Sequence, residues 1–249
     1  MIYDKAKQSF DEYTSNYNLK DKGIYLKYHH SYAVSNLMKD LAISLNLTSE
    51  EIEIAKVIGL LHDIGRFEQW KKFKSFDDRN VDHADESCNY LFNDGHIREF
   101  IDDNKYDLII ENAIRYHNKL TIPEMDEKSL FFTKMIRDMD KVDIYKQCAI
   151  HYEYTFNKDE VSKEVIDCFN KEESIPHKFR KSKSDSIIIM LAFIFDINFE
   201  ESFDILVETD NFDLFLSVVE ITPGSEEEWR KIREKCFDKI NRGIDKKEG

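Results

Sequence analysis

His62 and Asp63 stand next to each other at the end of the apolar run 57–61. An imidazole and a carboxylate can bind one metal ion together, and the carboxylate keeps a second oxygen that can bridge to another ion. The chain has only 8 histidines in 249 residues, yet other histidines and aspartates follow or open segments with helical periodicity on both sides of this pair. These candidate nitrogen and oxygen ligands favour a metal site, and they are His30, His62, Asp63, His83, His117 and Asp140.

Several candidate ligands share a stripe with apolar residues that recur at three- and four-residue steps, the spacing of a core-facing helix surface. His30 lies on the stripe of Val34, and Asp140 stands one turn after Ile136. A buried imidazole or carboxylate that finds no partner is costly. Any one of these residues is explained as well by a hydrogen-bonded core histidine or by an aspartate at a helix N-terminus. Metal coordination would satisfy the whole set at once, and we therefore interpret the set as a metal centre.

The same periodicity predicts the helices that must position these ligands. Thr48 and Glu51 fit a capping box at the start of a helix, and Gly65 is expected to end the helix that carries the His-Asp pair. Residues 71–82 are polar and are expected to form a loop with a short helical turn. No segment shows the alternation of a half-buried strand, so we predict an all-α fold. Helices are expected over 2–17, 24–45, 48–61, 83–91, 109–117, from 129, over 187–195, 203–206, 212–219 and from 225.

Composition limits the classes of protein that the chain can belong to. Hydrophobic residues make up 41% of the chain, which supports a real core, and the 7 glycines and 3 prolines are too few for a many-stranded protein. The net charge of −14 disfavours binding to duplex nucleic acid. The longest apolar stretch, 187–195, is about half the roughly 20 residues that span a bilayer. Four widely spaced cysteines and the lack of a signal sequence predict a cytoplasmic protein with reduced thiols and no membrane contact.

The region that carries the candidate ligands resembles the HD superfamily of metal-dependent phosphohydrolases. Order, helical context and flanking residues agree in five stretches, which are His29–Val34, Leu60–Phe67, Asp82–Ala84, Ile114–Asn118 and Arg137–Asp143. The resemblance implies an HD-domain helical bundle over 1–150, which we expect to be followed by a C-terminal helical extension, 151–249, packed on the same domain. It further implies that a first ion is held by His30, His62, Asp63 and Asp140. His83 and His117 match the subset with two metals, in which they would bind the second ion while Asp63 bridges.

Some positions leave a choice of ligand. His29 is adjacent to His30, but only His30 precedes the Ser-x-x-Val run of the family. Asp138 and Asp143 compete with Asp140, which fits best because Lys141 follows it. The remaining histidines match no family position and are expected to be exposed or partly buried, and they are His96, His151 and His177.

The resemblance implies hydrolysis of a phosphate mono- or diester, with a nucleotide or another small phosphorylated metabolite as the substrate. Imidazole and carboxylate ligands suit two divalent ions of Mn, Fe, Co, Ni or Zn better than Mg. Asp63 is the residue on which catalysis is expected to depend. Arg66, Lys71 and Lys72 are expected to bind substrate phosphate. A helix-end arginine explains Arg66 almost as well, and a solvated face explains the lysines better than phosphate binding does.

Two other functions remain alternatives. A few members of the superfamily use the same ligand set to hold a mixed-valence di-iron centre that activates O₂. A regulatory or scaffolding helical domain with a structural metal is the non-enzymatic alternative, and complete ligation without an exchangeable position would favour it. The sequence indicates no particular oligomeric state.

Overall fold

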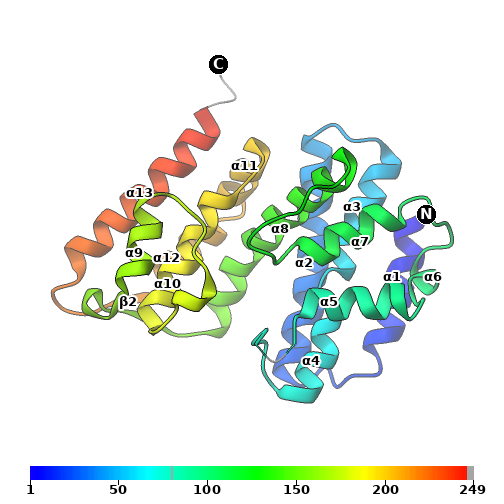
Figure 1. Cartoon of the computed structure of the whole chain (residues 1–249), viewed down its shortest axis with the longest axis horizontal. Coiled ribbons are helices and arrows are strands. Elements are labelled where there is room, and N and C mark those ends of the chain that lie inside the picture. Colours follow the sequence, from blue (N-terminus) through cyan, green and yellow to red (C-terminus); the bar gives the residue numbers. More distant parts are fainter. Residues whose placement is uncertain (80, 246–249) are drawn as a thin grey trace. The chain divides into compact units, whose positions relative to one another are not determined.

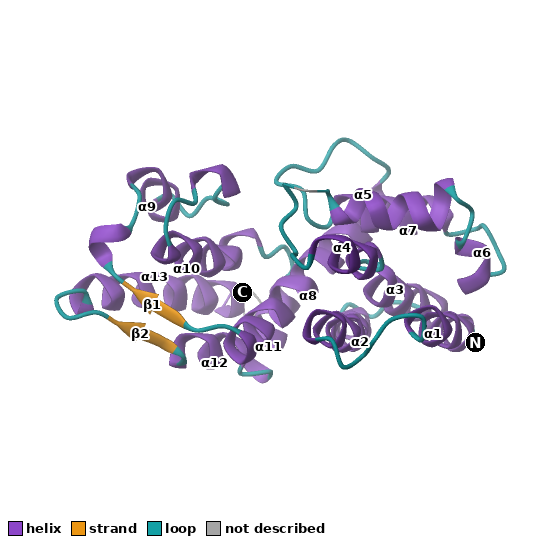
Figure 2. Cartoon of the chain, turned by 90° about the horizontal axis from the view of Figure 1, so that it is seen from below, coloured by secondary structure: helices purple, strands orange, loops and turns teal. Residues whose placement is uncertain are grey.

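A computed structural model describes residues 1–79 and 81–245 of the chain (Figure 1). Nearly all regular structure in these residues is helical, which confirms the predicted all-α fold (Figure 2). The chain forms two compact units that meet inside one long helix, with unit 1 ending at Asp140 and unit 2 beginning at Lys141. The division at residue 150 stays a prediction. No helix among the described residues has both the length and the apolar composition needed to cross a membrane.

Unit 1 consists of helices, and α1, α2 and α3 pack against one another in it (Figure 1). Its elements are α1 (Ile2–Thr14), α2 (Lys22–Ser44), α3 (Ser49–Leu61), α4 (Gly65–Phe73), α5 (His83–Cys88), the π-helical turn Asn89–Asn93, α6 (Ile97–Phe100), α7 (Asp107–Tyr116) and the first part of α8 (Glu127–His151). The capping box of α3 is confirmed, since Thr48 Oγ1 accepts from Glu51 N while the Glu51 carboxylate accepts from Thr48 N.

A close approach of backbones aligns α2 with α3. A Cβ atom added at Gly59 would lie 2.7 Å from Ser35 Cα, so no larger residue fits this contact without a shift. Ser35 Oγ also donates to the carbonyl of Lys56 across the same contact, at 2.8 Å. The C-terminus of α3 is therefore held against the middle of α2, where His30 lies.

The prediction that Gly65 ends a helix is wrong. Helix α3 ends at Leu61, a turn covers 62–64, and α4 begins at Gly65 without a left-handed backbone conformation. The absence of a side chain serves close packing instead, because a Cβ at Gly65 would lie 2.7 Å from both His83 O and Ser87 N of α5. Ser87 Oγ accepts from Gly65 N and donates to the carbonyls of His62 and His83, so it joins the turn to α5.

Unit 2 contains a short parallel strand pair that the sequence did not predict (Figure 2). Strand β1 pairs with β2 in the register Tyr154 to Val219 and Phe156 to Ile221. Three residues per strand are too few for an alternating pattern to show. The elements of unit 2 are the rest of α8, β1 (Tyr154–Phe156), a 3₁₀ turn (Lys158–Glu160), α9 (Lys163–Asn170), a 3₁₀ turn (His177–Phe179), α10 (Lys183–Leu191), a 3₁₀ turn (Ala192–Asp196), α11 (Glu200–Glu208), α12 (Asn211–Ser217), β2 (Val219–Ile221) and α13 (Glu226–Asp245).

A buried carboxylate fastens the start of α10. Asp185 accepts hydrogen bonds from the backbone N–H groups of Ser162, Lys181 and Ser182 and from the Ser162 hydroxyl. Burial by itself would raise the pKa of Asp185, but these donors outweigh burial and hold the pKa below its ordinary value of 3.8. The bonds therefore stabilise the fold when the carboxylate is ionised.

We predict that Asp185→Asn lowers the free energy of unfolding by about 2 kcal/mol at neutral pH, because an amide nitrogen cannot accept these bonds. A depressed pKa contributes stability above 3.8 that is lost as pH falls through the folded-state pKa, so the difference from wild type should shrink in acid. Urea denaturation as a function of pH measures both effects. The exposed Asp159→Asn is the control, and equal unfolding free energies of Asp185→Asn and wild type at neutral pH would contradict the prediction.

Candidate metal centre

The six candidate ligands converge in unit 1 from five separate places along the chain. His30 lies on α2, His62 and Asp63 form the turn after α3, His83 opens α5, His117 follows α7, and Asp140 lies on α8. All are buried except the Asp140 side chain, which is 15% exposed.

Four of these side chains bring one ligand atom each to a first cluster. Asp140 Oδ1 lies 3.1 Å from His30 Nε2 and 3.6 Å from His62 Nε2, and Asp63 Oδ2 lies 3.5 and 3.6 Å from the same two nitrogens. Donors that each lie about 2.1 Å from one ion are about 3.0 Å apart in an octahedral arrangement and about 3.4 Å apart in a tetrahedral one. The spacing of the first cluster therefore fits a single transition-metal ion.

The other two histidines form a second cluster with the remaining oxygen of Asp63. Asp63 Oδ1 lies 3.2 Å from His83 Nε2 and 3.8 Å from His117 Nε2, and the two nitrogens are 3.0 Å apart. One carboxylate thus gives one oxygen to each cluster, which is the arrangement of a bridging ligand. His62, Asp63 and His117 also satisfy the distances expected of metal ligands as a group.

Hydrogen bonds at Nδ1 orient three of the imidazoles. His62 Nδ1 lies 2.8 Å from the Gly59 carbonyl, and His117 Nδ1 lies 2.6 Å from the Ile114 carbonyl. A carbonyl can only accept, so each Nδ1 carries the proton and each Nε2 presents its lone pair to the centre. His83 Nδ1 lies 2.9 Å from Asp78 Oδ1, which has the same effect. Partners of this kind are common behind metal-binding histidines.

Two ligand atoms lack hydrogen bonds where burial demands a partner. Within residues 1–79 and 81–245, neither His62 Nε2 nor Asp63 Oδ1 makes a hydrogen bond, although both atoms are buried. Leaving a buried polar atom unsatisfied costs about 1–3 kcal/mol. Metal ions would satisfy both atoms, so the donor set fits the two ions that the sequence predicts.

Charge in the centre keeps its ligands in the forms that bind metal. Burial alone would raise the pKa values of Asp63 and Asp140. Lys27 and the neighbouring imidazoles outweigh burial at Asp63, and the adjacent imidazoles of His30 and His62 do so at Asp140, so both pKa values lie well below 3.8. For His117, burial and then the nearby histidines lower the pKa to about 3. At neutral pH the carboxylates are therefore ionised and His117 is neutral.

Comparison with known proteins agrees with this geometry. The family model of the HD domain matches residues 28–149, a span that holds all six candidate ligands. Residues 28–149 belong to the HD-domain superfamily. No curated protein and no solved structure gives a significant match.

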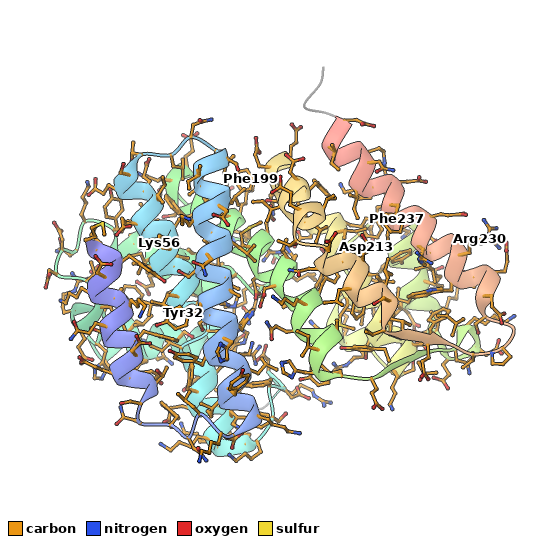
Figure 3. All side chains as sticks on the ribbon, turned by 180° about the vertical axis from the view of Figure 1, so that it is seen from behind. Tyr32, Lys56, Phe199, Asp213, Arg230 and Phe237 are labelled. Carbon is orange, nitrogen blue, oxygen red and sulfur yellow. The ribbon has the colours of Figure 1, made fainter. Side chains whose placement is uncertain are left out.

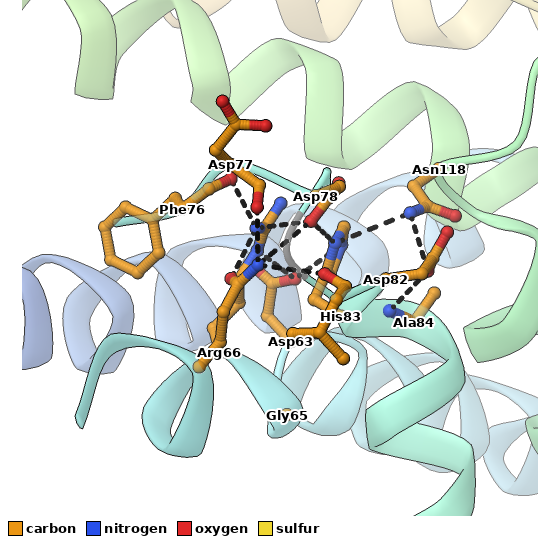
Figure 4. A network of polar contacts seen from close by, with 12 residues as sticks. Asp63, Gly65, Arg66, Phe76, Asp77, Asp78, Asp82, His83, Ala84 and Asn118 are labelled. Atoms are coloured by element: carbon orange, nitrogen blue, oxygen red, sulfur yellow. Dashed lines mark hydrogen bonds and ion pairs between the residues drawn. The ribbon is translucent and has the colours of Figure 1, made fainter. Parts of the chain in front are cut away.

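Two residues of the HD-domain centre were not predicted. Lys27 lies three residues before His30 on α2, and its Nζ is 2.6 Å from Asp63 Oδ2. That spacing places it on the same helix face as His30, a signal that the sequence does contain. Asp78 lies in the loop after α4 and accepts from Arg66, Gln69 and His83 (Figure 4). Loop residues follow no periodicity, so no comparable signal pointed to Asp78.

The predicted substrate-binding residues of the HD domain differ in their surroundings. Arg66 Nη1 donates to Gln69 Oε1, to the Phe76 carbonyl and to Asp78 Oδ1, so this part of the guanidinium holds the loop after α4 (Figure 4). Lys71 is 64% exposed and pairs with Glu68, and Lys72 is exposed. Phosphate binding by Arg66, Lys71 and Lys72 stays a prediction.

The residues that competed for ligand positions lie outside the two clusters. His29 is exposed and contacts the ring of Tyr25. Asp138 is buried and interacts with other groups, and Asp143 belongs to unit 2, where it accepts from Gln147. The other histidines are exposed or intermediate in burial, and they are His96, His151 and His177.

We predict that the HD domain binds two divalent ions. We further predict that substitution of a given ligand removes the ion or ions which that ligand binds. His83→Ala or His117→Ala should leave one ion per chain, whereas Asp63→Ala removes the shared carboxylate and should lower the occupancy of both sites. Metal analysis after dialysis against dilute metal measures the stoichiometry. His29→Ala is the matched control for His30→Ala and should keep both ions. Loss of metal from His29→Ala but not from His30→Ala would show that the ligand assignment is wrong.

Proposed function

We infer from the HD-domain match that this chain carries out metal-dependent chemistry of the phosphohydrolase type. We propose that this HD domain hydrolyses a phosphate mono- or diester of a nucleotide or another small phosphorylated metabolite, using two divalent ions. The observation that supports this proposal is the Asp63 carboxylate, whose two oxygens lie in two different clusters of imidazole and carboxylate ligands. A bridging carboxylate of this kind holds two ions close to each other.

Two such ions would lower the pKa of a shared water, polarise a phosphoryl oxygen and offset the charge of an in-line displacement. The chain itself supplies orientation. His62 and His117 are fixed by carbonyls of their own helices, and His83 is fixed by Asp78. Because these bonds exist within the folded protein, the ligands need little rearrangement to bind metal.

Arg137 adds a further constraint from the chain. Its guanidinium is buried and donates to the carbonyls of Tyr116, His117 and Lys119, where α7 ends. Arg137 precedes Asp140 by one turn on α8, so it joins a ligand of the second cluster to the helix that carries a ligand of the first. We propose that Arg137 keeps the two clusters at a fixed separation.

The proposal predicts hydrolysis of at least one member of a panel of nucleotides and generic phosphate esters, assayed with Mn, Fe, Co, Ni and Zn. A monoester should release inorganic phosphate, and a diester should release an alcohol and a phosphomonoester. Asp63→Ala should lower kcat by about 10³-fold or more, because both ions depend on this carboxylate. His96→Ala, an exposed histidine paired with Glu99, is the control and should retain full activity.

Two outcomes would contradict hydrolysis. Full activity in Asp63→Ala would exclude a mechanism that depends on the bridging carboxylate. Iron-dependent O₂ uptake with a di-iron optical band, and no hydrolysis of any ester of the panel, would instead favour the oxygenase alternative.

A further inference from the structure

Lys27 is a nearly buried cation with few contacts. Its side chain is 12% exposed, and its Nζ lies 2.6 Å from Asp63 Oδ2 and 5.2 Å from the centre of the Phe76 ring. An ammonium has three N–H donors. Among the described residues, Asp63 is its single hydrogen-bond acceptor. Two donors are therefore available to a ligand at a place where desolvation makes such bonds strong.

The hydrogen bonds of the other cations near the centre go to groups outside the ligand set, although Arg66 Nε also lies 3.7 Å from Asp63 Oδ1. Arg66 holds the loop after α4 through Phe76 O and Asp78, and Lys119 pairs with Asp82 and Asp85. Lys27 differs because its acceptor is the bridging ligand itself. Its charge is therefore directed at the metal centre rather than at the surrounding fold.

The side chains around the first cluster differ in how far they are exposed to solvent. The side chains of His62, His30 and Asp63 are 0%, 1% and 3% exposed, whereas those of Lys27 and Asp140 are 12% and 15% exposed. Lys27 and Asp140 are therefore the two of these five residues whose side chains reach solvent. An anionic group in solution can meet the Lys27 ammonium, which lies beside the first cluster.

We propose that Lys27 is a substrate-contacting residue, whose ammonium binds an anionic phosphoryl oxygen beside the cluster of His30, His62, Asp63 and Asp140. This inference rests on the proposed phosphohydrolase function, and it assigns the phosphate contact to a residue of α2 rather than to α4. The competing explanation is structural, with Lys27 serving only to balance the charge of the two buried carboxylates. The two explanations differ in whether phosphate affinity depends on Lys27.

The test uses the metal-loaded protein and inorganic phosphate as the probe, so that binding is measured by calorimetry without turnover. Lys27→Met and Lys27→Gln should weaken phosphate binding about 10- to 100-fold while both ions stay bound, because a charge-assisted hydrogen bond is lost. Lys27→Arg keeps the charge and should retain most of the affinity. Metal analysis and circular dichroism on each variant verify that the centre and the fold are intact, and the second neutral variant serves if Lys27→Met does not fold.

Lys56→Met is the matched control (Figure 3). Lys56 is 17% exposed, its Nζ pairs with Glu53 and it lies 3.8 Å from the centre of the Tyr3 ring. It therefore resembles Lys27 in exposure, in having a carboxylate partner and in contacting an aromatic ring, but it lies away from the centre. Its substitution should leave phosphate affinity unchanged.

Unchanged phosphate affinity in the neutral variants, with both ions bound, would overturn the inference. Loss of the ions from these variants would also overturn it, because Lys27 would then shape the centre rather than contact the substrate. A different result would refute the proposed function without refuting the role of Lys27. Phosphate binding that depends on Lys27, in a protein that hydrolyses no ester of the panel, would refute hydrolysis and support the contact.

Discussion

A single buried carboxylate, that of Asp63, is the constraint on which the centre depends. Its two oxygens face two sets of imidazoles, so the segments that carry His30, His62, His83 and His117 must all reach it. An ionised carboxylate in the interior is costly unless opposite charge or strong donors surround it. The ammonium of Lys27 and the neighbouring imidazoles meet this requirement and keep Asp63 ionised.

The packing of unit 1 is consistent with that constraint. Two of its glycines permit backbone contacts that no larger residue would allow, Gly59 between α3 and α2 and Gly65 between α4 and α5. Ser87 adds a buried hydroxyl that bonds to both sides of the second contact. These contacts flank the His62-Asp63 turn, so small residues beside the ligands determine how closely the helices that carry the ligands approach.

The sequence predicted the parts of this arrangement that follow from residue type and periodicity. The helices of unit 1 and the six candidate ligands belong to this class, because a polar residue on an apolar stripe is visible without coordinates. Gly65 was misinterpreted because a glycine that ends a helix and a glycine that allows close packing look alike in a sequence. The strands β1 and β2 are too short to show alternation, and Asp78 lies in a loop whose conformation depends on tertiary contacts with Arg66, Gln69 and His83.

Arg66 and Lys27, two cations near the centre, have different hydrogen-bond partners and therefore different roles. Arg66 has planar geometry suited to several fixed acceptors, and it holds the loop after α4 through a carbonyl and Asp78. Asp78 in turn orients His83, so the loop and the second cluster are mechanically joined. Lys27 has a flexible stem and a compact charge, and its single hydrogen-bond acceptor among the described residues is the Asp63 carboxylate. An anionic ligand that displaced the Nη1 bonds of Arg66 would disturb the loop and His83, whereas one that used Lys27 would leave both in place.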